Sequence, residues 1–109
     1  MDTTIRIGGK EFPFDALDVD FYRRYTDAEA AFQAAVAAGG GDETDCMEAQ
    51  ADAGHAFLDA VFGAGSADAA FGGKRNLRWI LEAYKSMAGL AKAQFDDFER
   101  LVRGDGAAD

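Results

Sequence analysis

The chain has 109 residues, of which 49% are apolar, and this suits one domain with its own hydrophobic core. Its formal net charge is −9, and no Lys or Arg occurs between Tyr25 and Gly73. Such an acidic surface repels phosphate groups, which argues against nucleic acids and anionic membranes as partners. The acidity is explained either by solubility or by attraction of a basic partner protein.

The cysteine content and the lengths of the apolar runs indicate where in the cell the protein is expected to be. Cys46 has no second cysteine with which to form an internal disulfide, which favours a reducing compartment. The first residues do not combine a basic region with an apolar run, so they do not resemble a signal peptide. No apolar run approaches the ~18 residues that a membrane-spanning helix needs. We therefore expect a soluble cytoplasmic protein.

Residues 3–14 predict a β-hairpin. Gly8 and Gly9 separate two short runs that favour extended backbone, and a two-residue primed turn needs positive φ at both central positions. Apolar side chains alternate along both runs, which gives the hairpin one apolar face: Ile5, Ile7, Phe12 and Phe14. Pro13 lacks a backbone N–H and suits an edge position. A lone hairpin is marginally stable in water, so we expect this one to lie on helices.

Two helices of medium length are predicted next. Asp18 is a suitable N-cap for a helix over residues 19–38, and Gly39 suits its C′ position. Steps of four and three residues draw one apolar stripe along it: Phe21, Tyr25, Ala28, Phe32 and Ala35. Asp42 opens a second helix that ends near Gly63, with a similar stripe: Met47, Ala51, Gly54, Leu58 and Val61.

A single helical turn and a long last helix complete the predicted fold. Ser66 is a candidate cap for a turn over residues 67–71, and the last helix runs from about Asn76 to Arg103. Its apolar stripe again advances by four and three residues: Leu77, Leu81, Tyr84, Ala88, Ala91, Phe95, Phe98 and Val102. Such a helix would be roughly 40 Å long, which exceeds what a domain of this size covers. Either its end projects, or another chain covers its apolar face.

Candidate protein-contact residues therefore lie on this helix and just before it. Four apolar residues fall outside the main stripe, and we predict that they face a partner: Trp79, Ile80, Met87 and Leu90. Three bases stand at the helix start: Lys74, Arg75 and Arg78. Bases at this end oppose the helix dipole, so they are either simply solvated or they contact acidic helices. Those acidic helices would belong to the same chain or to another copy in a homo-oligomer.

The residues that catalysis or metal binding would need are scarce. His55 is the one histidine, and Cys46 precedes it by nine residues, so the two point to opposite sides of one helix. One Cys and one His do not make a zinc site, and the acids around Asp45 lack the spacing of a calcium loop. Gly73 and Lys74 resemble the end of a phosphate-binding loop. However, Asp68 stands where that loop has its first glycine, and Arg75 stands where it has Ser or Thr. We predict no catalytic, cofactor-binding or metal site, and therefore no enzyme.

Two turn motifs resemble those of a known group of proteins. The first is Phe62-Gly63-Ala64-Gly65-Ser66-Ala67, and the second is Phe71-Gly72-Gly73-Lys74-Arg75-Asn76-Leu77. Together with the start Ile7-Gly8-Gly9-Lys10-Glu11-Phe12, they resemble small bacteriophage and prophage tail-region proteins similar to tail assembly chaperones. The motif residues serve structure: the glycines permit tight turns, and the aromatic residues hold the turns against the core. These structural turn residues are Phe62, Gly63, Gly65, Phe71, Gly72 and Gly73.

This resemblance implies a protein that coats the helical tape-measure protein and brings tail-tube proteins to it. Two alternatives remain: a structural virion or tail-completion component, and a small acidic regulator or inhibitor of a basic protein. In either case we expect one mainly α-helical domain over residues 1–103. It consists of an N-terminal β-hairpin and a bundle of three main helices with a long C-terminal helix. Residues 104–109 are expected to form a disordered tail.

Overall fold

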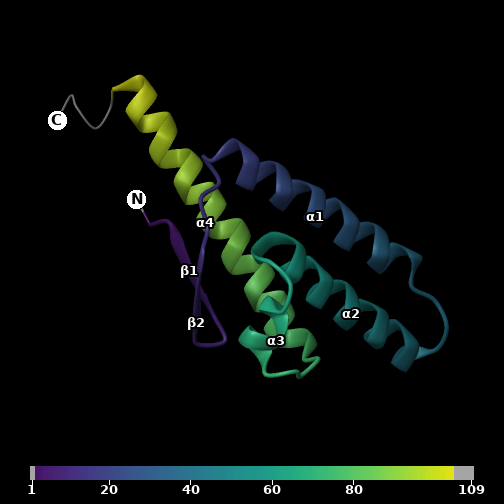
Figure 1. Ribbon diagram of the computed structural model, residues 1–109. Helices are drawn as coiled ribbons and strands as arrows, with labels where there is room; N and C mark the ends of the chain where they lie inside the picture. Colours follow the sequence, from purple (N-terminus) through teal and green to yellow (C-terminus); the bar gives the residue numbers. More distant parts are fainter. Residues whose placement is uncertain (1, 105–109) are drawn as a thin grey trace.

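A computed structural model describes residues 2–104 of the chain (Figure 1). The strands are β1 (Thr4–Ile7) and β2 (Lys10–Pro13), and the helices are α1 (Val19–Ala38), α2 (Glu43–Phe62), α3 (Ser66–Phe71) and α4 (Leu77–Arg103). The predicted class, mainly α-helical with an N-terminal hairpin and a long last helix, is confirmed. Gly104 caps α4, and the rest of the predicted tail lies outside the described residues.

The hairpin has the predicted turn and the predicted apolar face. Gly8 and Gly9 have φ values of 59° and 80°, and β1 pairs antiparallel with β2 so that Ile5 faces Phe12. Ile5 and Ile7 are buried, and β1 contacts α4. A Cβ atom added to Gly8 would lie 1.7 Å from the carbonyl oxygen of Ala70. The turn therefore packs directly on the backbone of α3, which fixes the hairpin on the helices as expected.

Side-chain caps explain where the long helices begin. The carboxylate of Asp18 accepts hydrogen bonds from the backbone at the start of α1, and the Asn76 side chain does the same for α4. Asp42 and Asp45 form a reciprocal capping box at the start of α2. Each cap satisfies N–H groups that have no partner inside the helix. The predicted starts of these three helices agree with the structure for this reason.

Two predicted helix caps are wrong, although α1 begins at Val19 and ends at Ala38 as predicted. Gly39 has a φ of −63° and an extended backbone, so α1 ends without the predicted left-handed C′ glycine. Ser66 is the first residue of α3 and does not cap it, because Gly65 occupies the N-cap position with a φ of 88°. The cap comes instead from α2, where the Asp59 carboxylate accepts a 2.9 Å hydrogen bond from the backbone N–H of Ala67.

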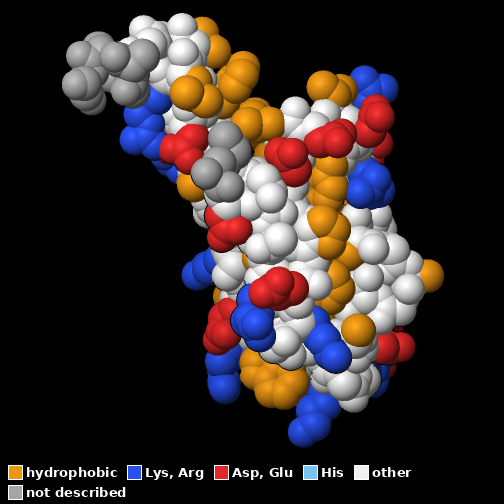
Figure 2. Space-filling model, turned by 60° about the vertical axis from the view of Figure 1, so that its left-hand side comes forward, with side chains coloured by type: hydrophobic (Ala, Val, Ile, Leu, Met, Phe, Trp, Pro, Cys, Tyr) orange, Lys and Arg blue, Asp and Glu red, His pale blue; other side chains and the backbone are white. Residues whose placement is uncertain are grey.

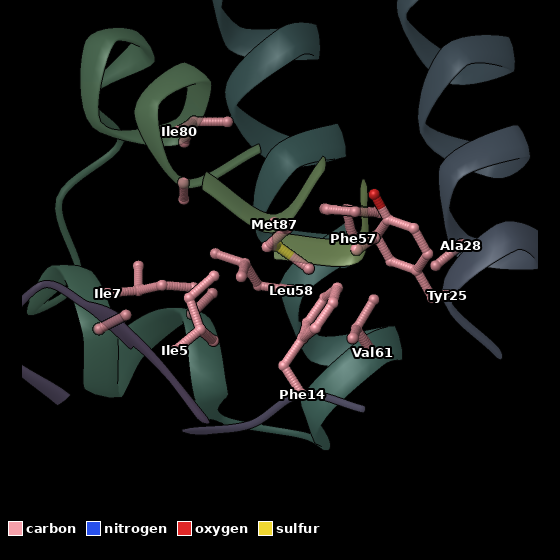
Figure 3. Packing of buried hydrophobic residues seen from close by; sticks show 14 of the residues in the cluster. Ile5, Ile7, Phe14, Tyr25, Ala28, Phe57, Leu58, Val61, Ile80 and Met87 are labelled. Carbon is pink, nitrogen blue, oxygen red and sulfur yellow. The ribbon is translucent and has the colours of Figure 1, made fainter. Parts of the chain in front are cut away.

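α1 and α2 lie side by side, and α4 packs against α2 with the hairpin on its other side (Figure 1). The crossing of α2 and α4 is close, because a Cβ atom on Gly54 would lie 2.4 Å from Cγ2 of Ile80. Side chains from the hairpin segment, α1, α2 and α4 meet in one core (Figure 3). Its largest fully buried apolar side chains are Phe14, Leu58, Val61 and Met87.

One polar side chain, Gln94 of α4, is fully buried at the edge of this core. Its Oε1 atom accepts a hydrogen bond from the backbone N–H of Ala16 at 2.7 Å. Its Nε2 atom donates to the carbonyl oxygens of Phe14 and Asp2 at 2.8 and 2.7 Å. All its hydrogen-bonding groups are therefore used, which offsets the cost of burying an amide.

Beyond Gln94, no further residue of α4 is buried. The last turns of the helix project from the rest of the domain, as the yellow end of α4 shows (Figure 1). The described part of the chain measures 56 × 27 × 22 Å along its principal axes, so it is distinctly elongated. No helix within residues 2–104 combines the length and the apolar character needed to cross a membrane.

Candidate helix-binding groove on the long C-terminal helix

α4 carries two apolar faces, and the face that enters the core includes two of the residues that were predicted to contact a partner. The buried positions are Ile80, Ala83, Met87, Ala91 and Gln94. Ile80 and Met87, predicted as partner contacts, are only 6% and 0% exposed and pack into the core of their own chain. The prediction is therefore wrong for Met87, while Ile80 reaches the surface only as part of a groove lining. The physical reason lies on α2, where Gly54 leaves a gap that the Ile80 side chain fills. Helical periodicity identifies both faces but cannot tell which of them meets such a gap.

The predicted stripe of α4 is instead largely exposed to solvent. Its residues advance by four and three, the spacing of a coiled-coil seam, and we call them the seam: Leu77, Leu81, Tyr84, Ala88, Ala91, Phe95, Phe98 and Val102. Only Ala91 of this set is fully buried. Leu81 is 52% exposed and Phe98 50%, which is unusual for large apolar side chains in a small domain. The seam spans about 37 Å at 1.5 Å per residue.

The first half of the seam forms one wall of an apolar groove. The groove has a volume of about 530 Å³ and lies between α1 and α4, with one residue from α2. Its lining is Phe32, Gln33, Val36, Ala37, Gln50, Leu77, Ile80, Leu81 and Tyr84. None of these side chains is charged. The volume falls within the ~300–1,000 Å³ range of ligand pockets, so the groove can receive apolar side chains of a partner.

Aromatic packing holds the floor of the groove in place. The Tyr84 ring lies 5.7 Å from the rings of both Phe32 and Phe57, measured between centroids. The Tyr84 hydroxyl donates a 2.7 Å hydrogen bond to the Glu29 carboxylate. This hydrogen bond, together with burial, raises the pKa of Tyr84. Tyr84 is therefore neutral across the physiological range and is held by contacts on both its ring and its hydroxyl.

Three bases recur every seven residues along one side of the seam: Arg78, Lys85 and Lys92. On a helical wheel they lie next to Leu81, Ala88 and Phe95, on the side away from the core. All three are exposed, and Lys92 forms an ion pair with Asp96 at 2.7 Å. Within residues 2–104, the side chains of Arg78 and Lys85 have no ion-pair partner. They give the exposed border of the seam a local positive charge on an otherwise acidic protein.

The other predicted contact residues are distributed over several places. Arg75 forms a 3.1 Å ion pair with Asp52 of α2, so its contact with an acidic helix within the same chain is confirmed. The Lys74 side chain is exposed, and its carbonyl oxygen lies 3.1 Å from Nε2 of His55. Leu90 is half-buried against the core. The predicted set is therefore not brought together at one surface.

Trp79 lies at a second hollow, on the opposite side of α4 from the groove. This hollow has a volume of about 510 Å³ and is also lined by Arg6 and Gly8 of the hairpin, Phe71 of α3, and Glu82 and Ser86 of α4. The Trp79 ring stacks on the Phe71 ring at 6.4 Å between centroids. Since Trp79 has a packing partner in its own chain and the hollow is mixed in polarity, the groove is the stronger candidate.

The glycine-rich turns serve to position α4 relative to the core. Gly63, Gly65, Gly72 and Gly73 all have positive φ, which side-chain-bearing residues rarely adopt. Phe62 stacks on Phe12 of the hairpin at 4.8 Å between ring centroids. Phe71 is buried between His55 and Trp79. Both aromatic residues therefore hold the turns against neighbouring elements, which is the role predicted for them.

The groups considered for chemistry lie apart. His55 is half-buried against Phe71 and Lys74, while Cys46 lies more than two turns earlier on α2. Among residues 2–104, no three His, Cys, Asp or Glu side chains lie close enough together to hold a metal ion. The described candidate site is thus an apolar surface with a basic border.

The part of the site that sequence reasoning missed is the wall provided by α1. Phe32 belongs to the predicted stripe of the first helix, whereas Val36 and Ala37 lie outside that stripe. The sequence signal for the groove lies on α4, where the four-three spacing of apolar residues continues for eight positions. This spacing indicates one wall of the groove, but it does not show which element forms the other wall.

Comparison with known proteins places the chain in a family. A family model matches residues 8–103, so the chain belongs to the family of unknown function DUF6673. No curated protein and no solved structure matched it. The matched range includes the turn of the hairpin, both glycine-rich turns and all of α4.

Proposed function

We propose that this chain is an assembly factor that binds an apolar helix of a partner protein in the groove beside the first half of the seam of α4, from Leu77 to Tyr84. The observation that carries the proposal is the exposure of the seam beside an uncharged groove, with Leu81 half-exposed at its edge. A partner helix would insert side chains at i, i+3 or i+4, and i+7, the usual anchors of helix-in-groove recognition. Burying each such side chain contributes about 1.5–3 kcal/mol of transfer free energy.

The charges around the seam indicate the kind of helix that fits. Arg78, Lys85 and Lys92 border it at seven-residue intervals, so a partner with acidic residues beside its own apolar stripe would be attracted. A basic helix would instead be drawn to the exposed acidic faces of α1 and α2. The preferred partner is therefore an amphipathic helix with an apolar stripe and an acidic flank.

The resemblance to tail assembly chaperones supplies a specific form of this proposal. The partner helix would then be part of a phage tape-measure protein, and tail-tube proteins would be brought to the same complex in the host cytoplasm. The chain's net charge of −9 would help to keep a coated apolar helix in solution. The position of its gene between a tail-tube gene and a very long tape-measure gene would support this form.

Titration of the purified chain with synthetic helices from that tape-measure protein tests the proposal directly. We expect saturable binding by calorimetry, and we expect Leu81→Asp to weaken it at least tenfold because a carboxylate would enter the apolar groove. Ala93→Asp is the matched control, since Ala93 is exposed on the opposite side of α4. No binding by the wild-type chain, or equal weakening by both variants, would contradict the proposal.

A second measurement separates a chaperone from the two alternatives. A chaperone would be absent from purified virions, whereas a tail-completion component would be present in a fixed copy number. An acidic inhibitor would bind its basic target with an affinity that falls steeply as salt rises, and Leu81→Asp would leave that affinity unchanged.

A further inference from the structure

A second apolar surface lies at the projecting end of α4, away from the groove. Nine large apolar side chains are exposed within residues 2–104, and six of them belong to this end. We call these six the tip patch: Val19 and Tyr22 at the start of α1, and Phe95, Phe98, Leu101 and Val102 of α4. Figure 2 shows hydrophobic side chains gathered at this end of the molecule.

Aromatic contacts join the two helices of the tip patch to each other and to the core, where the Tyr22 ring lies 6.1 Å from the Tyr25 ring between centroids. Tyr22 and Phe95 meet edge to face, with 5.1 Å between ring centroids. Beyond this pair, Leu101 and Val102 are each 69% exposed. The buried anchor of α4, Gln94, comes before all four of its patch residues, so no described element covers them. A helix end with this many exposed apolar side chains would be stabilised by a partner surface that buries them.

The charges of this helix end indicate which partner can bind there. Residues 92–103 contain three bases and three acids, so this segment is neutral in a chain of net charge −9. The six are paired along the helix: Lys92 with Asp96, Asp97 with Arg100, and Glu99 with Arg103. Two acidic chains repel each other at most other surfaces. At this segment they can approach with little repulsion.

We propose that a second copy of this chain covers the tip patch, through antiparallel pairing of the two α4 ends about a two-fold axis. The seam spacing permits this, because antiparallel pairing can place Phe95 of each copy against Phe98 of the other. In that register Lys92 of one copy lies on the same side as Glu99 of the other, which adds two symmetric charge pairs. The proposal is independent of helix binding in the groove, which this arrangement leaves open.

The size of the tip patch sets the strength of the dimer. Six large side chains are far fewer than the ~20–30 residues per side of a standard interface. The expected dimer is therefore weak, with a dissociation constant on the order of micromolar. Salt should strengthen it, because screening reduces the repulsion between two chains of charge −9 while apolar contacts persist.

Sedimentation equilibrium of the full chain over a wide range of protein concentrations tests the proposal. The average mass of the wild type should rise from monomer towards dimer with concentration, and more steeply at higher salt. Phe98→Asp should remain monomeric under the same conditions. Leu81→Asp is the matched control, because Leu81 has nearly the same exposure on the same helix but lies outside the tip patch. It should dimerise like the wild type.

Several outcomes would contradict the proposal that a second copy of the chain binds the tip patch. A wild-type chain that stays monomeric at all concentrations would do so, as would dimers that Leu81→Asp abolishes and Phe98→Asp preserves. If the wild type is monomeric and Phe98→Asp weakens binding of a tape-measure helix, the tip patch belongs to the heterologous partner instead. Circular dichroism of each variant verifies that it is folded, since both substituted positions are exposed. Failure of dimerisation leaves the helix titration unaffected, so the two proposals are tested separately.

Discussion

The Oε1 atom of Gln94 accepts a 2.7 Å hydrogen bond from the backbone N–H of Ala16, across 78 positions of sequence. This contact holds the segment between the hairpin and α1 against the last helix. It also marks the point on α4 where the buried part of the helix ends and the projecting part begins. The orientation of the seam and of the tip patch therefore depends on it.

Replacement of Gln94 by Leu should destabilise the fold by about 2–4 kcal/mol. The variant leaves the Ala16 N–H and the Phe14 carbonyl buried without partners, and each such group costs about 1–3 kcal/mol. Urea unfolding followed by circular dichroism measures the change. Gln50→Leu is the control, because Gln50 is exposed and its loss should change stability by less than about 0.5 kcal/mol. Equal stability of Gln94→Leu and the wild type would contradict the role given to Gln94.

Introduction of a methyl group at Gly54 should be unfavourable despite the better helix propensity of Ala. The new Cβ atom would lie 2.4 Å from Cγ2 of Ile80, so α2 and α4 would have to separate. We expect Gly54→Ala to cost about 1–3 kcal/mol. Gly89→Ala is the matched control, since nothing lies within 4 Å of its added Cβ, and it should stabilise α4 by about 0.5–1 kcal/mol.

A double-mutant cycle then tests whether Ile80 is the cause. Ile80→Ala in the Gly54→Ala background should cost less than Ile80→Ala alone, because alanine lacks the Cγ2 atom that the new Cβ atom would meet. Thermal unfolding of the four proteins gives the coupling free energy. Additive effects would mean that the two residues do not limit the approach of the helices.

Stability should fall at high pH because of Tyr25. Burial, together with the nearby charge of Glu29, raises the pKa of Tyr25 to about 12, against an ordinary value of 10.0 that the unfolded chain retains. The folded state thus keeps its proton where the unfolded state loses it. The stabilisation is fully present below pH 10 and is lost as the pH rises through about 12. The free energy of unfolding of Tyr25→Phe should decline less steeply in this window, and a slope equal to that of the wild type would contradict the assignment.

Charge reversal at the start of α4 should distinguish Arg75, which pairs with Asp52 inside the chain, from Arg78, which we expect to contact the partner helix. Arg75→Glu breaks the exposed ion pair with Asp52 and should lower stability by at most about 1 kcal/mol, with little effect on helix binding. Arg78→Glu has no ion pair to break and should raise stability by at most about 1 kcal/mol, because a carboxylate suits the first turn of α4. It should nevertheless weaken binding of an acidic-flanked helix about three- to tenfold. Calorimetric titration and thermal unfolding of both variants measure the two effects. Equal binding by the two variants would argue against a role for the basic border of the seam.

The sequence determined the local structure of this protein. The Gly8-Gly9 turn and the starts of the three main helices depend on residues within a few positions of one another, through backbone φ and side-chain caps. The same holds for the uneven charge and for the two apolar faces of α4, which follow from spacing alone. Where a partner came from a neighbouring element, as with the Asp59 cap on α3, local reasoning chose the wrong residue.

Only the tertiary structure decided which face of α4 enters the core. Ile80 turns inward because Gly54 leaves room for it, and the Gln94 amide is buried because three backbone groups from the hairpin segment satisfy it. Both contacts join elements far apart in the chain, and their free energies depend on shape and complete hydrogen bonding, which periodicity does not record. The regular seam, whose spacing could not show whether this chain or another one covers it, is for this reason largely exposed.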